Sequence, residues 1–189
     1  MATIDILCVI DTNGLMKKGL KPGTLDNPTG LGGWSDSDSF VFMICDGQYA
    51  CNNQGKSELS IKANIGDTLR WTITDPSTGL ISGQQNKSFS CILYKFKSAG
   101  INKQITDPVL KSTPALTYYN SLNSATTPSA GAYMCSSWTS SVLSLGSNIQ
   151  YDWSFQVIDN FSGDVVGYYT WDPFINVQEA AIGAEVEAL

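Results

Sequence analysis

The residue types that most often carry enzyme and metal chemistry are sparse in this chain, and one of them is missing. The sequence has no histidine and five cysteines among its 189 residues. Without histidine the chain can build neither a Ser-His-Asp or Cys-His mechanism nor the imidazole sites that usually hold zinc, copper or iron. No two cysteines have the CxxC spacing of a redox or zinc site. These features predict a non-enzymatic protein that has no metal and no cofactor.

The remaining candidate chemistry lies in two polar segments that each carry a tryptophan. Trp34 stands beside Ser35-Asp36-Ser37-Asp38, and Trp138 lies among serine and threonine. Aromatic rings in loops can stack on sugars, and loop carboxylates can hold Ca²⁺. The candidate ligand residues of a lectin-like module are therefore Trp34, Asp36, Asp38 and Trp138. The alternative for each tryptophan is an ordinary half-buried loop side chain.

Composition limits the partners and the compartment. Hydrophobic residues make up 42% of the chain, charged residues only 15%, and the formal net charge is −6. Nucleic-acid binding needs clustered Lys and Arg, so this balance argues against a nucleic-acid partner. No stretch approaches the ~20 apolar residues of a membrane helix, and no export signal follows Met1. We expect a cytoplasmic protein without a membrane partner, whose five cysteines are buried and reduced.

Alternation of apolar and polar residues predicts β-strands along most of the chain. Trp153, Phe155 and Val157 alternate with polar residues, and Asn160–Asp164 has the composition of a turn before a return strand. The same pattern in earlier segments completes a predicted core of Ile6, Cys8, Leu59, Ile61, Leu69, Trp71, Cys91, Leu93, Trp153, Phe155 and Val157. No segment before residue 178 has a convincing helical period. The sequence therefore predicts an all-β fold, a single-domain β-sandwich of antiparallel strands.

Two long polar stretches, residues 17–39 and 98–130, interrupt the predicted strands. We interpret both as loops, and loops of this length are usually functional or mobile. Residues 178–189 are rich in Ala and Glu, which suits a short helix or a disordered tail. The predicted organisation is one domain over residues 1–177 followed by an acidic C-terminal tail over residues 178–189.

Several segments resemble the bacterial inclusion body protein family typified by PixA and AidA. Residues 167–175 carry the closing Gly-Tyr-aromatic-x-Trp-Asp-Pro-Phe-Ile segment of that family, and residues 4–12 and 59–71 resemble its early strands. Matching blocks run in the expected order from residue 3 to residue 177. The resemblance implies a non-enzymatic protein that accumulates in cytoplasmic inclusions, in settings of stationary phase or cell-density control. Its partner would be itself, whereas the lectin-like alternative would bind a glycan.

The closing segment also supplies a candidate surface for self-association. It falls at the end of the predicted sandwich, where a closing strand often lies at a sheet edge, and its only charge is Asp172. Low surface charge opposes association weakly, and a two-fold homodimer is the simplest closed arrangement. The candidate residues are Tyr168, Tyr169, Trp171, Asp172 and Phe174. The alternative is that these aromatic side chains fill the core of the monomer.

Overall fold

The computed structural model describes residues 1–33, 40–76, 88–97, 104–121 and 124–178. In order along the chain the elements are β1 (Thr3–Ile10), α1 (Thr12–Lys18), β2 (Thr29–Gly30), β3 (Val41–Cys45), β4 (Ala50–Asn52), β5 (Ser60–Asn64), β6 (Thr68–Thr74), β7 (Phe89–Lys97), β8 (Val109–Ser121), β9 (Ser124–Ser141), β10 (Gly146–Gln150), β11 (Asp152–Asp159), β12 (Val165–Trp171) and β13 (Phe174–Gln178). This content confirms the all-β class. Residues 179–189, most of the predicted tail, lie outside the described residues.

The strands form three sheets, with the orders β3-β1-β6-β9-β8, β10-β13-β5-β4 and β2-β12-β11-β7. Three neighbouring pairs are parallel, namely β1 with β6, β12 with β2 and β13 with β5. The expectation of purely antiparallel strands was therefore wrong. Alternation along one strand carries no information on the direction of its neighbour, since both kinds of ladder present side chains with a period of two. The closure of these sheets as a two-layer sandwich stays a prediction.

The core predicted from alternation is confirmed. All eleven predicted side chains belong to one buried cluster, and Trp71 and Trp153 have no exposed surface. In β1 the buried residues are every second one from Ile4 to Ile10, as the period of a strand requires. The period-2 pattern therefore identified the inward face of each of these strands correctly.

The absence of a helix before residue 178 was a wrong expectation, because α1 occupies residues 12–18. The Asp11 carboxylate caps its first turn by accepting a hydrogen bond from the Gly14 amide at 2.9 Å. Gly19 ends the helix in the left-handed conformation, with φ of +70°. A helix of two turns is too short to establish a 3.6-residue period, so the capping residues were the only local signal.

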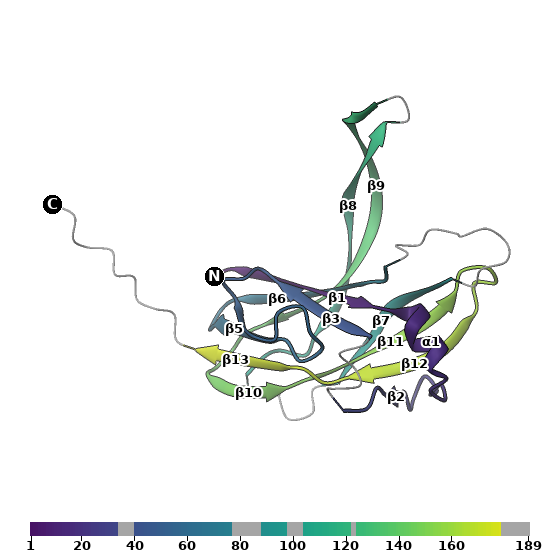
Figure 1. Cartoon of the computed structure of the whole chain (residues 1–189). Coiled ribbons are helices and arrows are strands. Elements are labelled where there is room, and N and C mark those ends of the chain that lie inside the picture. The colour runs from purple at the N-terminus through teal and green to yellow at the C-terminus, as the bar shows by residue number, and fades with distance from the viewer. Residues whose placement is uncertain (34–39, 77–87, 98–103, 122–123, 179–189) are drawn as a thin grey trace.

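The interpretation of residues 98–130 as a loop was also wrong for most of that stretch. β8 and β9 form a long antiparallel hairpin, and Figure 1 shows it projecting from the body of the molecule. We call residues 109–121 and 124–137 the arm. Its strands are rich in Ser, Thr, Ala and Tyr, and their small side chains blur the contrast between apolar and polar positions from which strands are predicted.

The closing segment does not lie at a sheet edge, contrary to the expectation. β12 lies between β2 and β11, and β13 lies between β10 and β5. Pro173 falls between these two strands, where its missing N–H interrupts no ladder. The pairing of Phe174 with Ser60 joins residues far apart in the chain, so the last strand in sequence need not be the last in space.

Truncation of the buried indole of Trp71 is expected to lower the free energy of unfolding by about 3–5 kcal/mol, because Trp71→Ala leaves a large cavity in the core. The matched control is Phe161→Ala, since this side chain is 80% exposed and its loss should change stability by less than about 0.5 kcal/mol. Urea denaturation followed by circular dichroism measures both. Equal effects for the two variants would contradict the assignment of the core.

Candidate interaction surface

The arm is a two-stranded ribbon with little of its own chain against it. β8 is the edge strand of its sheet, and β9 pairs with β6 only from Trp138 to Ser141. Lys111 is the only charged residue in the arm. A two-stranded hairpin is marginally stable in water by itself, and exposed edges are usually protected by charge. The arm therefore has the features of a segment that is covered by something else.

The register of the hairpin divides its side chains between two faces, because directly paired residues lie on the same side of a ribbon. We call the even-numbered side chains from 110 to 120 and from 128 to 136 the apolar face. Its apolar members are Leu110, Pro114, Leu116, Tyr118, Pro128, Ala130, Ala132 and Met134. Among them Leu116 is 60% exposed, Tyr118 69% and Met134 62%. The other face carries Lys111, several threonines and the exposed side chains of Val109, Tyr119 and Tyr133. The apolar face is thus the side of the arm that carries no charge.

The apolar face continues the side of the sheet that covers the core. At the root of the arm, Trp138 pairs directly with the buried Trp71, so both indoles lie on the inward side. Trp138 also packs against Phe96 at a ring separation of 5.3 Å and donates a hydrogen bond to the Leu93 carbonyl at 3.4 Å. Beyond Trp138 the same side of β9 leaves the body, and its side chains become exposed. The side of β9 that is buried in the body therefore continues along the arm as an exposed surface.

The two prolines of the arm favour contact through its faces over pairing along its edges. Pro114 is paired with Met134, and Pro128 with Asn120. Paired positions of an antiparallel ladder alternate between hydrogen-bonded and non-hydrogen-bonded, and both prolines occupy the same one of these two kinds of position. Proline has no N–H and fits an intact ladder only where its nitrogen points away from the partner strand. Each outer edge of the arm therefore lacks a donor at one point, a device that discourages strand addition.

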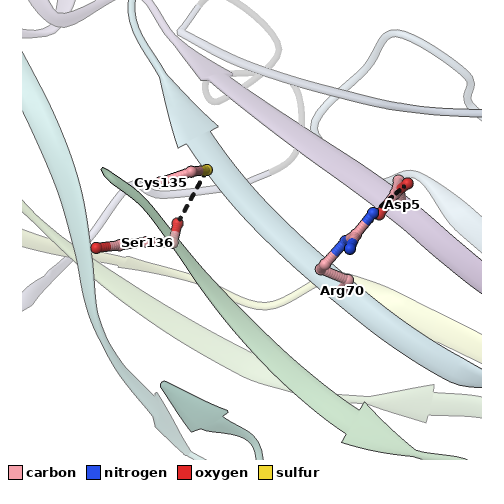
Figure 2. Close-up of polar contacts among 4 residues, drawn as sticks. All are labelled: Asp5, Arg70, Cys135 and Ser136. Atoms are coloured by element: carbon pink, nitrogen blue, oxygen red, sulfur yellow. Dashed lines mark hydrogen bonds and ion pairs between the residues drawn. The ribbon is translucent and has the colours of Figure 1, made fainter. Parts of the chain in front are cut away.

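The opposite face of the arm overhangs the outer side of the same sheet. A cavity of about 440 Å³ lies there, lined by Leu7 and Ile44 of the sheet and by Ala115 of the arm, among others. Figure 2 shows the polar groups beside it: Arg70 of β6 donates to the Asp5 carboxylate of β1 at 2.5 and 2.8 Å. This hydrogen bonding raises the pKa of Arg70. Both side chains are exposed, so the pair contributes only about 0.2–1 kcal/mol.

The predicted ligand site stays a prediction, because most of its residues, namely Trp34, Asp36 and Asp38, lie outside the described residues. Trp138 belongs to strand β9 and packs against Phe96, so the expectation that a loop presents it was wrong. No group of three or more metal-binding side chains occurs within the described ranges.

The predicted self-association residues are likewise divided between the core and separate surfaces. Tyr169 has no exposed surface and Trp171 only 3%, and the Trp171 indole donates to the Ser57 carbonyl at 2.8 Å. For these two residues the structure agrees with the alternative of a filled monomer core. Tyr168 is half-buried, with its ring edge-on to that of Tyr94 at 5.5 Å.

The last two candidates, Asp172 and Phe174, are also half-buried. The Asp172 carboxylate accepts a hydrogen bond from the Gln150 amide, and burial raises its pKa. Phe174 lines a hollow together with Asn52 and Asn148. The closing segment therefore offers no continuous apolar surface, and the arm, which sequence reasoning missed, does. The sequence feature that could have indicated the arm is the near absence of charged residues over residues 109–137.

Fold and surface together define a β-rich protein with an exposed apolar arm that carries a single charged residue. The profile of the PixA family, described as inclusion body protein, matches residues 2–177, and the chain belongs to this family. The chain is similar to the crystal structure of an inclusion body protein (PixA) from Burkholderia cenocepacia J2315, with a TM-score of 0.65 and 20% sequence identity. The similarity covers 92% of this chain and 95% of that chain. Among curated proteins none matches the sequence.

The family match ends at residue 177, and β13 continues to Gln178. Within the described part of the chain, no helix is long and apolar enough to cross a membrane.

The five cysteines are free, but not all are buried as expected. Cys8, Cys45 and Cys91 lie in the core, whereas Cys135 is half-buried and Cys51 is exposed. Burial raises the pKa of the Cys8 and Cys91 thiols far above the usual value, because the thiolate would lose its hydration. Their reactivity at neutral pH should therefore be very low.

Alkylation should separate these thiols. With iodoacetamide at pH 8, we expect Cys51 to react first, Cys135 more slowly, and Cys8, Cys45 and Cys91 only after denaturation. Peptide mass spectrometry at successive times measures this order, and Cys51→Ser provides a control that should lose the fast phase alone. Rapid labelling of Cys8 in the native protein would contradict the structure.

Proposed function

We propose that this member of the PixA family is a non-enzymatic protein whose function is to self-associate and to accumulate in cytoplasmic inclusions, with a role in stationary phase or cell-density control. The observation that carries the proposal is the uncharged apolar face of the arm, which the described chain leaves uncovered. The missing histidine adds to it, because the commonest general base and metal ligand is unavailable.

Exposed surface of this kind supports association for energetic reasons. Contiguous apolar patches on soluble proteins tend to mark interaction sites, since burying them releases roughly 25 cal/mol per Å². Charge would normally oppose contact between like surfaces, and the arm has a single lysine, Lys111, on its other face. An ordered two-stranded ribbon also gains stability when a further layer covers it. Contact between copies would supply that layer.

Shortening of the arm tests this proposal directly. Thr113 and Cys135 are directly paired, so residues 114–134 can be replaced by Asn-Gly, which closes a two-residue hairpin. Sedimentation velocity should show dimers or larger species of the full chain at micromolar concentration, and a monomer of the shortened chain. The melting temperature should change little, because the residues removed lie outside the core cluster. A full-length chain that sediments as a clean monomer up to 100 μM (roughly −5.5 kcal/mol of binding free energy) would refute the proposal.

A second candidate function, binding of a glycan or a similar hydroxylated ligand, is favoured by a hollow of about 570 Å³ that polar residues and one aromatic ring line together. It is lined by Asn52, Asn53, Lys56, Glu58, Ser60, Asn148 and Phe174. Asn53 and Asn148 adopt positive φ, of 58° and 50°, a conformation that asparagine tolerates better than most residues. Amide groups beside an aromatic ring suit a sugar, whose hydroxyls need polar partners and whose ring has an apolar face.

A glycan array probed with the labelled protein tests this second candidate. If it is correct, the array should give specific signals, and Asn52→Ala should weaken them because a hydroxyl partner is lost. Thr117→Ala, on the arm, is the control and should leave the signals unchanged. Repetition with EDTA shows whether a divalent cation takes part. An array without specific signals, with or without added Ca²⁺, would count against this function.

A further inference from the structure

We propose that two copies of the chain pair through the apolar faces of their arms, about a two-fold axis. In this dimer a ridge formed by Leu116 and Tyr118 on each β8 lies in a furrow formed by Ala130 and Ala132 on the partner's β9. The inference rests on the proposed self-association and specifies which surface carries it and which partner it takes.

The ridge and the furrow follow from the register of the hairpin. Leu116 is paired with Ala132, and Tyr118 with Ala130, so at two successive positions of the apolar face a large residue on β8 stands beside a small one on β9. All four residues are exposed. Because β-strands in a ribbon lie about 4.8 Å apart, this difference in size gives the face a raised side along β8 and a lowered side along β9.

Such a face is complementary to itself. In a two-fold interface, a residue i of one copy that contacts residue j of the other is matched by the contact of j with i. Turning one arm over about a two-fold axis parallel to its strands sets each ridge above the other copy's furrow, so both packing contacts form at once. An unrelated partner would need a ridge and a furrow of its own at the matching spacing. A second copy of this chain already has them, and this argues for it as the occupant.

The remaining surfaces of the arm fit this contact less well. The outer edges are interrupted by Pro114 and Pro128, which remove donors from any ladder with another strand. The opposite face carries Lys111 and faces the cavity beside the Asp5–Arg70 pair, so it is more polar and partly occupied by its own sheet. Of the two faces, only the apolar one carries no charged residue.

The size of the face sets the expected strength of the dimer. The apolar face runs from residue 110 to 120, and a two-stranded ribbon of that length has a footprint of about 40 Å by 10 Å, or ~400 Å² per copy. Specific stable interfaces bury about 800 Å² per partner, and smaller ones belong to weak or transient complexes. The arms should therefore form a reversible, concentration-dependent dimer. Additional contacts between dimers would be needed to build larger assemblies.

Two adjacent tyrosines provide a matched pair of variants. Tyr118 belongs to the apolar face and is 69% exposed, whereas Tyr119 points to the opposite face and is 57% exposed. Tyr118→Glu should raise the dissociation constant of the dimer at least about tenfold, since it places a carboxylate in the furrow, and Tyr119→Glu should change it less than about twofold. Sedimentation velocity over a concentration series measures both. Unchanged melting temperatures and circular dichroism spectra verify that the body is intact in each variant.

A mixing experiment tests the contact between ridge and furrow. Leu116→Glu alone and Ala132→Lys alone should each weaken the dimer about tenfold or more, because each introduces a charge at both copies of the contact. An equimolar mixture should form heterodimers more strongly than either variant forms homodimers. In the mixed dimer one contact carries Glu against Lys, and the other retains Leu116 against Ala132. Differently labelled chains followed by energy transfer report the heterodimer.

Each outcome decides a separate point. Equal effects of Tyr118→Glu and Tyr119→Glu, or a mixture that associates no better than its components, would overturn the pairing of apolar faces even if the wild-type chain dimerises. A wild-type chain that stays monomeric would instead overturn the proposed self-association itself. Loss of dimer in Tyr118→Glu alone, together with heterodimers in the mixture, would support the arrangement.

Discussion

The indole of Trp71 joins the sheet that carries the arm to the rest of the molecule. Its ring lies 5.0 Å from that of Phe96 on β7 and 5.4 Å from that of Tyr151, which precedes β11. Its N–H donates to the Tyr151 hydroxyl at 3.0 Å, so this polar atom is satisfied within an otherwise apolar core. Since β6, β7 and Tyr151 come from distant parts of the chain, this one side chain fixes how the elements around it pack.

The arm depends on the same arrangement. Trp138 is paired with Trp71 and packs on Phe96, so the aromatic cluster holds β9 at the point where it leaves the body. The placement of Trp138 in this cluster sets which way each face of the hairpin points, because side chains alternate strictly along a strand. The side of the sheet that covers the core in the body thus becomes an open apolar surface further along the same strand. The packing of Trp138 in the core thus determines which side chains of the arm form the candidate interaction surface.

The two candidate surfaces differ in chemistry as well as in place. The arm is apolar, almost uncharged and suited to burial, whereas the hollow that includes Asn148 and Phe174 is rich in amide groups and suited to a hydrated ligand. The hollow is lined by residues of β4, β5, β10 and β13 and of the loops beside them, and Figure 1 shows β5, β10 and β13 apart from the arm. Substitutions in one surface should therefore leave the other intact, so the two functions can be tested independently.

The sequence by itself determined the all-β class, the inward faces of the strands and the family, because alternation and the closing segment around Trp171 are local patterns that survive without knowledge of neighbours. Only the tertiary structure decided the parallel pairs, the interior place of β13 and the existence of the arm. Strand order depends on pairings such as Phe174 with Ser60, whose energy comes from residues over a hundred positions apart. The exposure of Leu116 and Tyr118 likewise follows from where β9 leaves β6, which no local pattern specifies.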